Sequence, residues 1–217
     1  MIQSIEVAGR IRDEIARGTI AFGEPLRIAD LAARYRVSAM PIREALRQLN
    51  GEGLITLAPN RTAHVRQVSE QYLRQLFDLH LAVEGVLARA AAASWRATDT
   101  KTLLALHQEL EAAVACSDAE TVLAVNQRFH TFIYERSNNP DALAAIERHW
   151  FLMAALWKHY GYSESRFPGV LNDHWHIIKA LDQGDVVGVG FLVGAHVLKA
   201  RDNILEVVLR RSRNGDE

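Results

Sequence analysis

The sequence lacks most of the features that mark membrane-spanning, secreted or fibrous proteins. Its 217 residues include one cysteine, Cys116, so no intramolecular disulfide can form. Every apolar run is shorter than the 18 or more residues that a membrane-spanning helix needs, and the N-terminal residues do not have the pattern of a secretory signal. An apolar share of 49% and a charged share of 24% are ordinary for a globular protein. These observations predict a cytoplasmic protein without a membrane partner.

Lysine is missing from the first 68 residues, although arginine is abundant there. This part has ten arginines and seven acidic residues, a balance of +3, whereas the rest of the chain has a balance of −4. A basic segment joined to an acidic one indicates that the first has a polyanionic partner. On charge alone, an ordinary solvated surface explains the asymmetry equally well.

The apolar periodicity of the first 51 residues predicts three helices. Residues 4–17 carry apolar side chains every four positions and are followed by Gly18, a typical C-terminal cap. A second helix is expected over residues 27–35. A third is expected to begin after Ser38, a favourable N-cap, and to end at Asn50 and Gly51. Two helices separated by such a short turn form a helix-turn-helix, whose second helix can enter the major groove of DNA.

Two short strands are predicted after these helices. Residues 54–57 and 63–65 have strand-like composition, and Pro59, Asn60 and Arg61 form the turn between them. A β-hairpin in this position is typical of a winged helix-turn-helix. Residues 1–68 are therefore predicted to be a DNA-binding domain of three helices and a β-hairpin wing, with double-stranded operator DNA as its partner.

The rest of the chain, residues 69–217, shows helical periodicity throughout. The expected segments are 70–94, 101–116, 118–136, 141–160, 167–183 and 185–211. We therefore expect an all-α bundle of six or seven helices, which makes the fold class mainly α. Gly188, Gly190 and Gly194 lie inside the last segment, where they either permit close helix packing or bend the helix.

Two stretches of sequence resemble a known family of regulators. The run V-S-A-M-P-I-R-E-A-L over residues 37–46, followed by E-G-L-I over residues 52–55, resembles the GntR family. The larger domain resembles the FadR-type effector domain called FCD, through Glu84, the run N-Q-R-F-H over 126–130, Asn139, the pair Asp173-His174, Gly184-Asp185 and His196. The resemblance covers nearly the whole chain. It implies a homodimeric, ligand-responsive transcription regulator, a repressor released by a small organic acid.

The candidate DNA-reading residues lie on the expected third helix and on the wing. They are Ser38, Arg43, Arg47, Asn60 and Arg61. Arg43 lies on the face that the apolar residues leave open, where an arginine can reach a phosphate or a guanine edge. Taken singly, Arg47 is explained as well by an ordinary solvated side chain.

The chain departs from the family pattern in its DNA-reading part. Ala39 and Met40 stand where the resemblance implies a base-contacting arginine and a threonine. Arg36 and Thr62 stand where it implies the glycines of the helix-helix turn and of the wing. These departures predict an operator that differs from the usual family pattern.

Four polar residues on the apolar stripes of the larger domain form a candidate metal site. Asn126 and His130 are four residues apart on one predicted helix, and His174 and His196 lie on two others. A single histidine of this kind is more often a satisfied core residue, but three on separate helices favour a shared role, because each buried imidazole needs a partner. By resemblance these are the FCD metal ligands, with Asn126 in place of an aspartate. Imidazole suits zinc or nickel, and the neutral amide is expected to weaken binding.

Five further residues are candidates for binding a small carboxylate-containing effector. They are His80, Glu84, Arg128, Trp150 and Trp157. His80 stands where the resemblance implies an arginine that holds an acidic ligand. Arg128 could supply the missing charge, although its position on the helix favours the exterior. The tryptophans belong to a helical stripe that is more often core than pocket.

A metal-dependent enzyme is the competing hypothesis. His130, His174 and His196 could hold a metal that activates water at an open position. The sequence has no nucleophile motif, and Glu84 is the one residue that could be proposed as a general base. We therefore expect a regulator without enzymatic activity.

Overall fold

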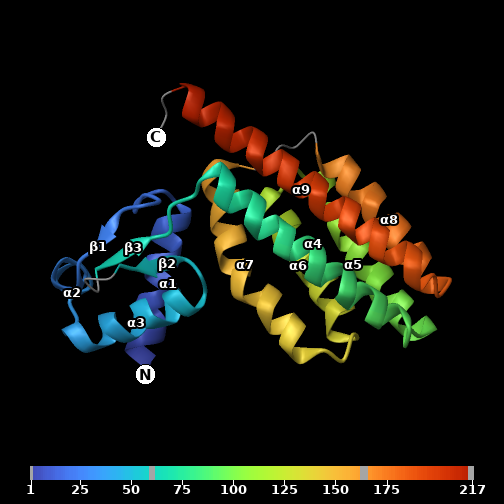
Figure 1. The fold of residues 1–217 in the computed structure, drawn as a ribbon, viewed down its shortest axis with the longest axis horizontal. Coiled ribbons are helices and arrows are strands. Elements are labelled where there is room, and N and C mark those ends of the chain that lie inside the picture. Colours follow the sequence, from blue (N-terminus) through green and yellow to red (C-terminus); the bar gives the residue numbers. More distant parts are fainter. Residues whose placement is uncertain (1, 59–61, 162–165, 215–217) are drawn as a thin grey trace. The chain divides into compact units, whose positions relative to one another are not determined.

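The computed structural model describes residues 2–58, 62–161 and 166–214 of this mainly helical chain (Figure 1). The first part contains α1 (Ile2–Ala16), β1 (Pro25–Leu26), α2 (Ile28–Tyr35), α3 (Ala39–Gly51), β2 (Ile55–Leu57) and β3 (Ala63–Val65). The second part contains α4 (Glu70–Ala92), α5 (Ala97–Ala115), α6 (Ala119–Glu135), α7 (Pro140–Tyr160), α8 (Phe167–Asp182) and α9 (Val186–Asn214). This order confirms the predicted fold class. Among the described helices, none has the length and apolarity to cross a membrane.

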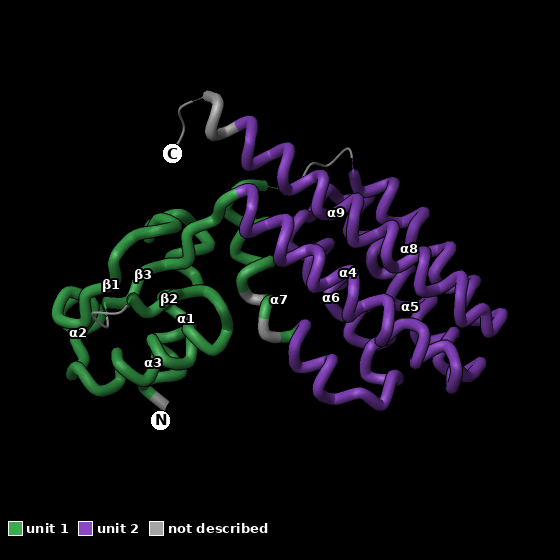
Figure 2. The backbone as a smooth tube through the Cα atoms, in the orientation of Figure 1, with its two compact units in different colours: residues 1–69, 147–161 green, residues 70–146, 162–217 purple. Residues whose placement is uncertain are grey.

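The chain divides into two compact units (Figure 2). Residues 1–69 and 147–161 form one unit, and residues 70–146 and 162–217 form the other. The division into domains 1–68 and 69–217 stays a prediction. The second half of α7 groups with the first unit, where Phe22 meets the ring of His159 edge-on at 5.2 Å and stacks on Tyr160 at 6.0 Å.

Partly buried contacts to acidic side chains fix the helices of the first unit. Arg12 on α1 donates two hydrogen bonds, of 2.7 and 2.9 Å, to the carboxylate of Glu52 at the end of α3. The hydroxyl of Tyr35 on α2 donates to Glu14 of α1 at 2.9 Å. Such two-pronged arginine–carboxylate pairs specify geometry as well as contributing energy. They hold α2 and α3 against α1, so α3 presents one fixed face to solvent.

The small sheet has the strand order β1-β3-β2, with both pairs antiparallel. Strand β1 is not among the elements predicted from the sequence. Pro25 is compatible with a strand at the edge of a sheet, where no neighbour needs the N–H that proline lacks. In the sheet Leu26 pairs with Ala63, and Ile55 pairs with Val65.

Five helices of the second unit close into a ring. Helix α4 packs against α9 and α6, α5 packs against α6 and α8, and α8 packs against α9. Each helix contributes a large apolar side chain that is fully buried: Leu87, Leu103, Phe129, Ile177 and Val193. Side chains on the inner faces are thereby removed from water, which makes every polar group among them significant.

Glycines let α9 approach α4 closely. Of the two roles that the sequence left open, close packing and bending of the helix, this is the first. A Cβ atom on Gly190 would stand 2.8 Å from Nη1 of Arg89, and one on Gly194 would stand 3.1 Å from Leu81. Both distances are tighter than normal packing allows. The loss of helix propensity at these glycines is therefore offset by close helix-helix contact.

Arg36 is the basis of a stability prediction, because it ends α2 in a left-handed conformation (φ 56°, ψ 44°). This conformation strains any residue with a Cβ, whereas glycine adopts it freely. Arg36→Gly should raise the free energy of unfolding by about 0.5–1 kcal/mol, after allowance for the greater freedom of glycine in the unfolded chain. Urea unfolding measures the change. The matched variant Arg47→Gly, inside α3, should lower the free energy of unfolding by about 1 kcal/mol. A lower free energy of unfolding in both variants would contradict the left-handed conformation assigned to Arg36.

Candidate functional site

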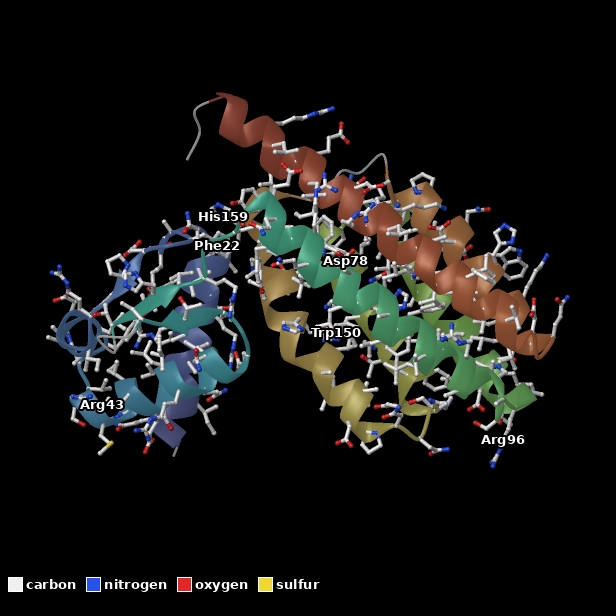
Figure 3. The ribbon with its side chains drawn as sticks, in the orientation of Figure 1. Phe22, Arg43, Asp78, Arg96, Trp150 and His159 are labelled. Atoms are coloured by element: carbon white, nitrogen blue, oxygen red, sulfur yellow. The ribbon has the colours of Figure 1, made fainter. Side chains whose placement is uncertain are left out.

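Helix α3 presents an open basic face. Ile42, Leu46 and Leu49 are buried in the core of the first unit, whereas Arg43 and Arg47 are exposed. Figure 3 labels Arg43 on this helix. In the part of the chain that the structure describes, neither arginine has an ion-pair or hydrogen-bond partner. Both guanidinium groups are therefore available to an external anion.

Ser38 occupies the N-cap position of α3, as predicted, but its side chain does not cap the helix. The backbone there is extended (φ −71°, ψ 168°) and no capping hydrogen bond forms. The hydroxyl and the first N–H groups of α3 are consequently open to a phosphate oxygen. Met40, in the first turn, has 62% of its surface exposed. Asn60 and Arg61, the two wing residues of the prediction, lie outside the described residues.

The helical ring gathers three histidines in its interior. His130 of α6, His174 of α8 and His196 of α9 are 5%, 0% and 6% exposed. One ring nitrogen of each lies within 4.8 Å of the others. We call these three residues the histidine cluster. Nε2 of His130 and Nε2 of His196 are 3.3 Å apart.

Contacts with two carboxylates determine which ring nitrogen of His130 and of His196 carries the hydrogen. Nδ1 of His196 lies 3.3 Å from Asp173, which also accepts from Lys199. An ionised carboxylate only accepts, so we assign an Nδ1–H to His196. Tyr134 donates to Glu84, so its oxygen accepts from Nδ1 of His130 at 3.2 Å. Both histidines therefore carry their proton on Nδ1.

This assignment leaves two lone pairs facing each other, because the Nε2 atoms at 3.3 Å have no hydrogen between them. His174 adds a second anomaly. Its imidazole is fully buried and stacked on Phe129 at 3.9 Å, and neither ring nitrogen has a hydrogen-bond partner among the described residues. A buried polar nitrogen without a partner costs about 1–3 kcal/mol. All three histidines thus offer unused lone pairs in one small, dry space.

The donor set fits a transition metal ion. Two imidazole nitrogens bonded to one zinc ion at about 2.1 Å in tetrahedral geometry lie about 3.4 Å apart, close to the separation of the two Nε2 atoms. The other nitrogens of His130 and His196 already have oriented partners, which is the arrangement that fixes metal-ligating imidazoles in place. Imidazole nitrogens suit zinc and nickel.

Burial sets the charges around the cluster. It lowers the pKa of His130 to about 3, with help from His196, and it lowers the pKa of His174 well below its usual value. Burial would raise the pKa of Glu84, but the hydrogen bond and charge of His80 and the contact with Tyr134 lower it overall. The pKa of Asp173 is likewise lowered by His196 and Lys199 against the effect of burial. His130 and His174 are therefore neutral, and the acids Glu84 and Asp173 are ionised.

The other predicted residues divide into three groups. His80 and Glu84 join the cluster, because Nδ1 of His80 lies 2.6 Å from Glu84, which accepts from Tyr134. Asn126 is half-buried on α6, one turn before His130. Arg128 does not join: its side chain is 56% exposed and pairs with Glu109 at 2.5 Å on the outside of the bundle. The expectation that Arg128 supplies charge to the effector site is therefore corrected.

Trp150 and Trp157 lie on the half of α7 that belongs to the first compact unit. Trp157 is 8% exposed, and the shielded indole N–H of Trp150 has no hydrogen-bond partner among the described residues. The structure groups neither with the histidine cluster. Their role in effector binding stays a prediction.

Sequence reasoning gave no role in the site to three residues that support the cluster. Tyr134 follows His130 by one helical turn, Asp173 precedes His174, and Lys199 follows His196 by three residues. The spacing of Tyr134 and Lys199 was a usable signal, because residues three or four apart share a helix face. The pairing of Asp173 with His196 was not readable from spacing, since it joins two helices.

A helix-turn-helix with an open basic face, joined to a helical bundle with a polar interior, defines a DNA-binding regulator with a sensor domain. The comparisons agree. Residues 3–65 match the model for bacterial regulatory proteins of the gntR family, and residues 75–199 match the FCD domain. The chain therefore belongs to the GntR family and has an FCD effector domain. It is a transcription regulator, and nothing in these comparisons supports the enzyme hypothesis.

Its relatives include named regulators. The chain is 27% identical over 180 residues to the HTH-type transcriptional regulator McbR of Escherichia coli, covering 82% of this chain and 80% of McbR. It is 31% identical over 157 residues to the repressor GlaR of E. coli, covering 70% and 71%. It is also 27% identical to the Nta operon transcriptional regulator of Aminobacter aminovorans, covering 86% and 87%.

Solved structures share the fold. E. coli McbR/YncC matches with a TM-score of 0.74 at 24% identity, covering 94% of this chain and 97% of that one. A GntR transcriptional regulator of Rhodococcus sp. RHA1 matches with a TM-score of 0.71 at 22% identity, covering 95% and 99%. These likenesses extend across both parts of the fold.

The neutral buried histidines predict acid sensitivity of the metal-free protein. An unfolded histidine has a pKa near 6.5, whereas the pKa of His130 is about 3 and that of His174 is far below 6.5. The unfolded chain therefore binds more protons below pH 6.5, so stability falls as the pH drops from 6.5 toward 3. The pKa values of Glu84 and Asp173 are lowered, so these acids add little above pH 5.

Between pH 6 and pH 5, we expect each of these two histidines to lower the free energy of unfolding by about 1 kcal/mol for each pH unit that the pH falls. Urea unfolding in a chelator at several pH values measures the slope. His174→Phe should remove its share, while His176→Phe, at an exposed neighbouring position, should leave the slope unchanged. A slope unaffected by His174→Phe would show that this histidine is not neutral in the fold.

Proposed function

We propose that this protein is a homodimeric repressor that a small carboxylate-containing effector releases from operator DNA, with a divalent metal at the histidine cluster. The observation that carries the proposal is the convergence of unused imidazole lone pairs in the interior of the FCD domain. Such a centre can bind a cation, and a cation with neutral ligands attracts an anionic oxygen. As a regulator of operator DNA, the protein is proposed to act in the cytoplasm.

The DNA-binding part of the proposal assigns the reading surface to α3 and the wing. Arg43 would contact a guanine edge or a phosphate, Ser38 and Arg47 would contact phosphates, and Asn60 and Arg61 would place the wing. A base contact made by a forked guanidinium discriminates by about 1–3 kcal/mol. Arg43 therefore carries most of the proposed specificity.

The direct test is a gel-shift assay with operator DNA selected from a random duplex pool by the full-length protein. Arg43→Ala should weaken binding about tenfold or more, because it removes an oriented contact from the middle of the interface. Arg128→Ala, an exposed arginine of the bundle, serves as the matched control and should bind as the wild type does. Failure of the wild type to select any sequence would refute the function.

The metal part of the proposal assigns His130, His174 and His196 as ligands, with Asn126 as the neutral residue next to them. When bound, the metal would supply a fixed positive charge that attracts an effector carboxylate. His80 and Glu84 would shape the same site from α4. Zinc and nickel are the ions that best suit the donor set.

Titration calorimetry with zinc tests this assignment. Asn126→Asp should tighten zinc binding by at least about tenfold, because it adds a negative charge beside the cation. His174→Ala should abolish measurable binding, while His176→Ala should leave it unchanged. Equal affinity of Asn126→Asp and the wild type would place Asn126 away from the metal.

The dimer part of the proposal rests on an exposed apolar patch along α4 and α9. Val86 and Phe191 follow Gly85 and Gly190, and a Cβ atom on Gly85 would stand 3.8 Å from the backbone oxygen of Gly190. Phe191 is 76% exposed and Val187 is 64% exposed. A grouped apolar patch of this kind is typical of an interaction surface. A two-fold dimer also suits the symmetry of operators.

Sedimentation at micromolar concentration tests the dimer. Phe191→Glu should shift the protein to the monomer, because two buried carboxylates would face each other across a two-fold axis. Trp175→Glu changes an aromatic residue on α8 that is 41% exposed and should leave the dimer intact. A dimer in both variants would exclude the α4/α9 patch.

A further inference from the structure

We propose that Arg166 anchors one carboxylate of the effector, and that the effector is a small dicarboxylate whose other end lies at the histidine cluster. The inference deepens the proposed function and rests on it. It replaces Arg128, which faces away from the cluster, with a residue that the sequence did not single out.

Arg166 stands at the start of α8 and is partly buried. Its Nη2 donates a hydrogen bond of 3.3 Å to the backbone oxygen of His196, a member of the cluster. Its Nε is shielded from solvent and has no hydrogen-bond partner in the described part of the chain. The positive charge also contributes to the low pKa of His174, after burial and the neighbouring histidines. Arg166 is therefore close to the cluster and has an unused donor.

The missing partner distinguishes Arg166 from similar arginines. Among the described residues of the bundle, the other partly buried arginines each have an acid: Arg136 pairs with Asp99 at 2.8 Å, and Arg201 pairs with Asp202 at 2.9 Å. Arg166 has no acid within ion-pair distance in that part of the chain. A guanidinium does not deprotonate in proteins, so its charge persists. A shielded charge without a counterion is costly unless a ligand supplies the anion.

The nearby acids cannot fill this role. Glu84 already accepts from Tyr134 and His80, and Asp173 already accepts from Lys199 and lies against His196. Among the described residues, no acid is left to pair with Arg166, and we propose that the effector supplies the anion. A guanidinium fork matches a carboxylate, which can accept two parallel N–H donors.

Two separate centres of positive charge predict an effector with two anionic ends. Arg166 offers one at the start of α8, and a cation at the histidine cluster offers the other, since its imidazole ligands are neutral. One carboxylate neutralises one centre only. A small molecule with a carboxylate at each end satisfies both, which points to a short aliphatic dicarboxylate.

The experiment compares succinate with butyrate, which has the same four-carbon length but one carboxylate. Thermal unfolding of the full-length, zinc-loaded protein is followed as each acid is titrated. We expect succinate to stabilise the wild type at concentrations at least tenfold below those of butyrate. Arg166→Gln should weaken the binding of succinate about ten- to hundredfold, because it removes a charge-assisted pair of hydrogen bonds. Arg201→Gln should respond as the wild type does.

Each alternative outcome overturns a defined part of the account. Equal responses of the wild type to succinate and butyrate would reject the dicarboxylate. Unchanged succinate affinity in Arg166→Gln would reject Arg166 as the anchor. No response of the zinc-loaded wild type to either acid would reject the carboxylate effector of the proposed function. If Arg166→Gln does not fold, Arg166→Lys keeps the charge without the fork, and full retention of succinate affinity would reject the forked contact.

Discussion

The protons on His130 and His196 are fixed by two ionised carboxylates, and the rest of the sensor site depends on this constraint. Asp173 acts directly on His196, and Glu84 acts on His130 through the hydroxyl of Tyr134. Both imidazoles must then direct a lone pair into the same space, 3.3 Å apart. No arrangement of hydrogens within the described residues removes this repulsion without breaking one of the outer contacts. The interior is thereby organised around a missing positive charge.

The surrounding fold maintains this unfavourable arrangement. Five helices close into a ring, and the large apolar side chains on their inner faces exclude water from the polar groups. The glycines of α9 let it pack tightly on α4, so the ring has little freedom to relax. Without its ligand, a site of this kind lowers stability, and a ligand that binds only the folded state restores it. In the proposed function, the same coupling lets ligand occupancy bias the conformation that binds DNA.

The sequence predicted those parts of the fold and site that depend on local spacing. Helical periodicity and capping residues located both the helix-turn-helix and the six helices that follow, because these signals act within a few residues. The three histidines were also found, since each lies on an apolar stripe. Residue spacing did not predict the contacts between segments that are far apart in the sequence. Strand β1, the grouping of the second half of α7 with Phe22, and the Asp173–His196 pair all depend on tertiary contacts. Arg128 and Arg166 show the same limit. The sequence does not reveal that Arg128 pairs with an acid on the surface, or that Arg166 has no acid partner among the described residues.

The central claim is that the histidine cluster and the DNA-reading face of α3 are coupled. Coupling is reciprocal, so an effector that releases the protein from DNA must itself bind more weakly to the DNA-bound protein by the same factor. The most direct measurement is the succinate affinity of the full-length, zinc-loaded protein, free and saturated with its selected operator DNA. The account predicts a Kd for succinate at least about fivefold weaker in the operator complex, matched by an equal loss of operator affinity in succinate. Identical succinate affinities in the two states would contradict it.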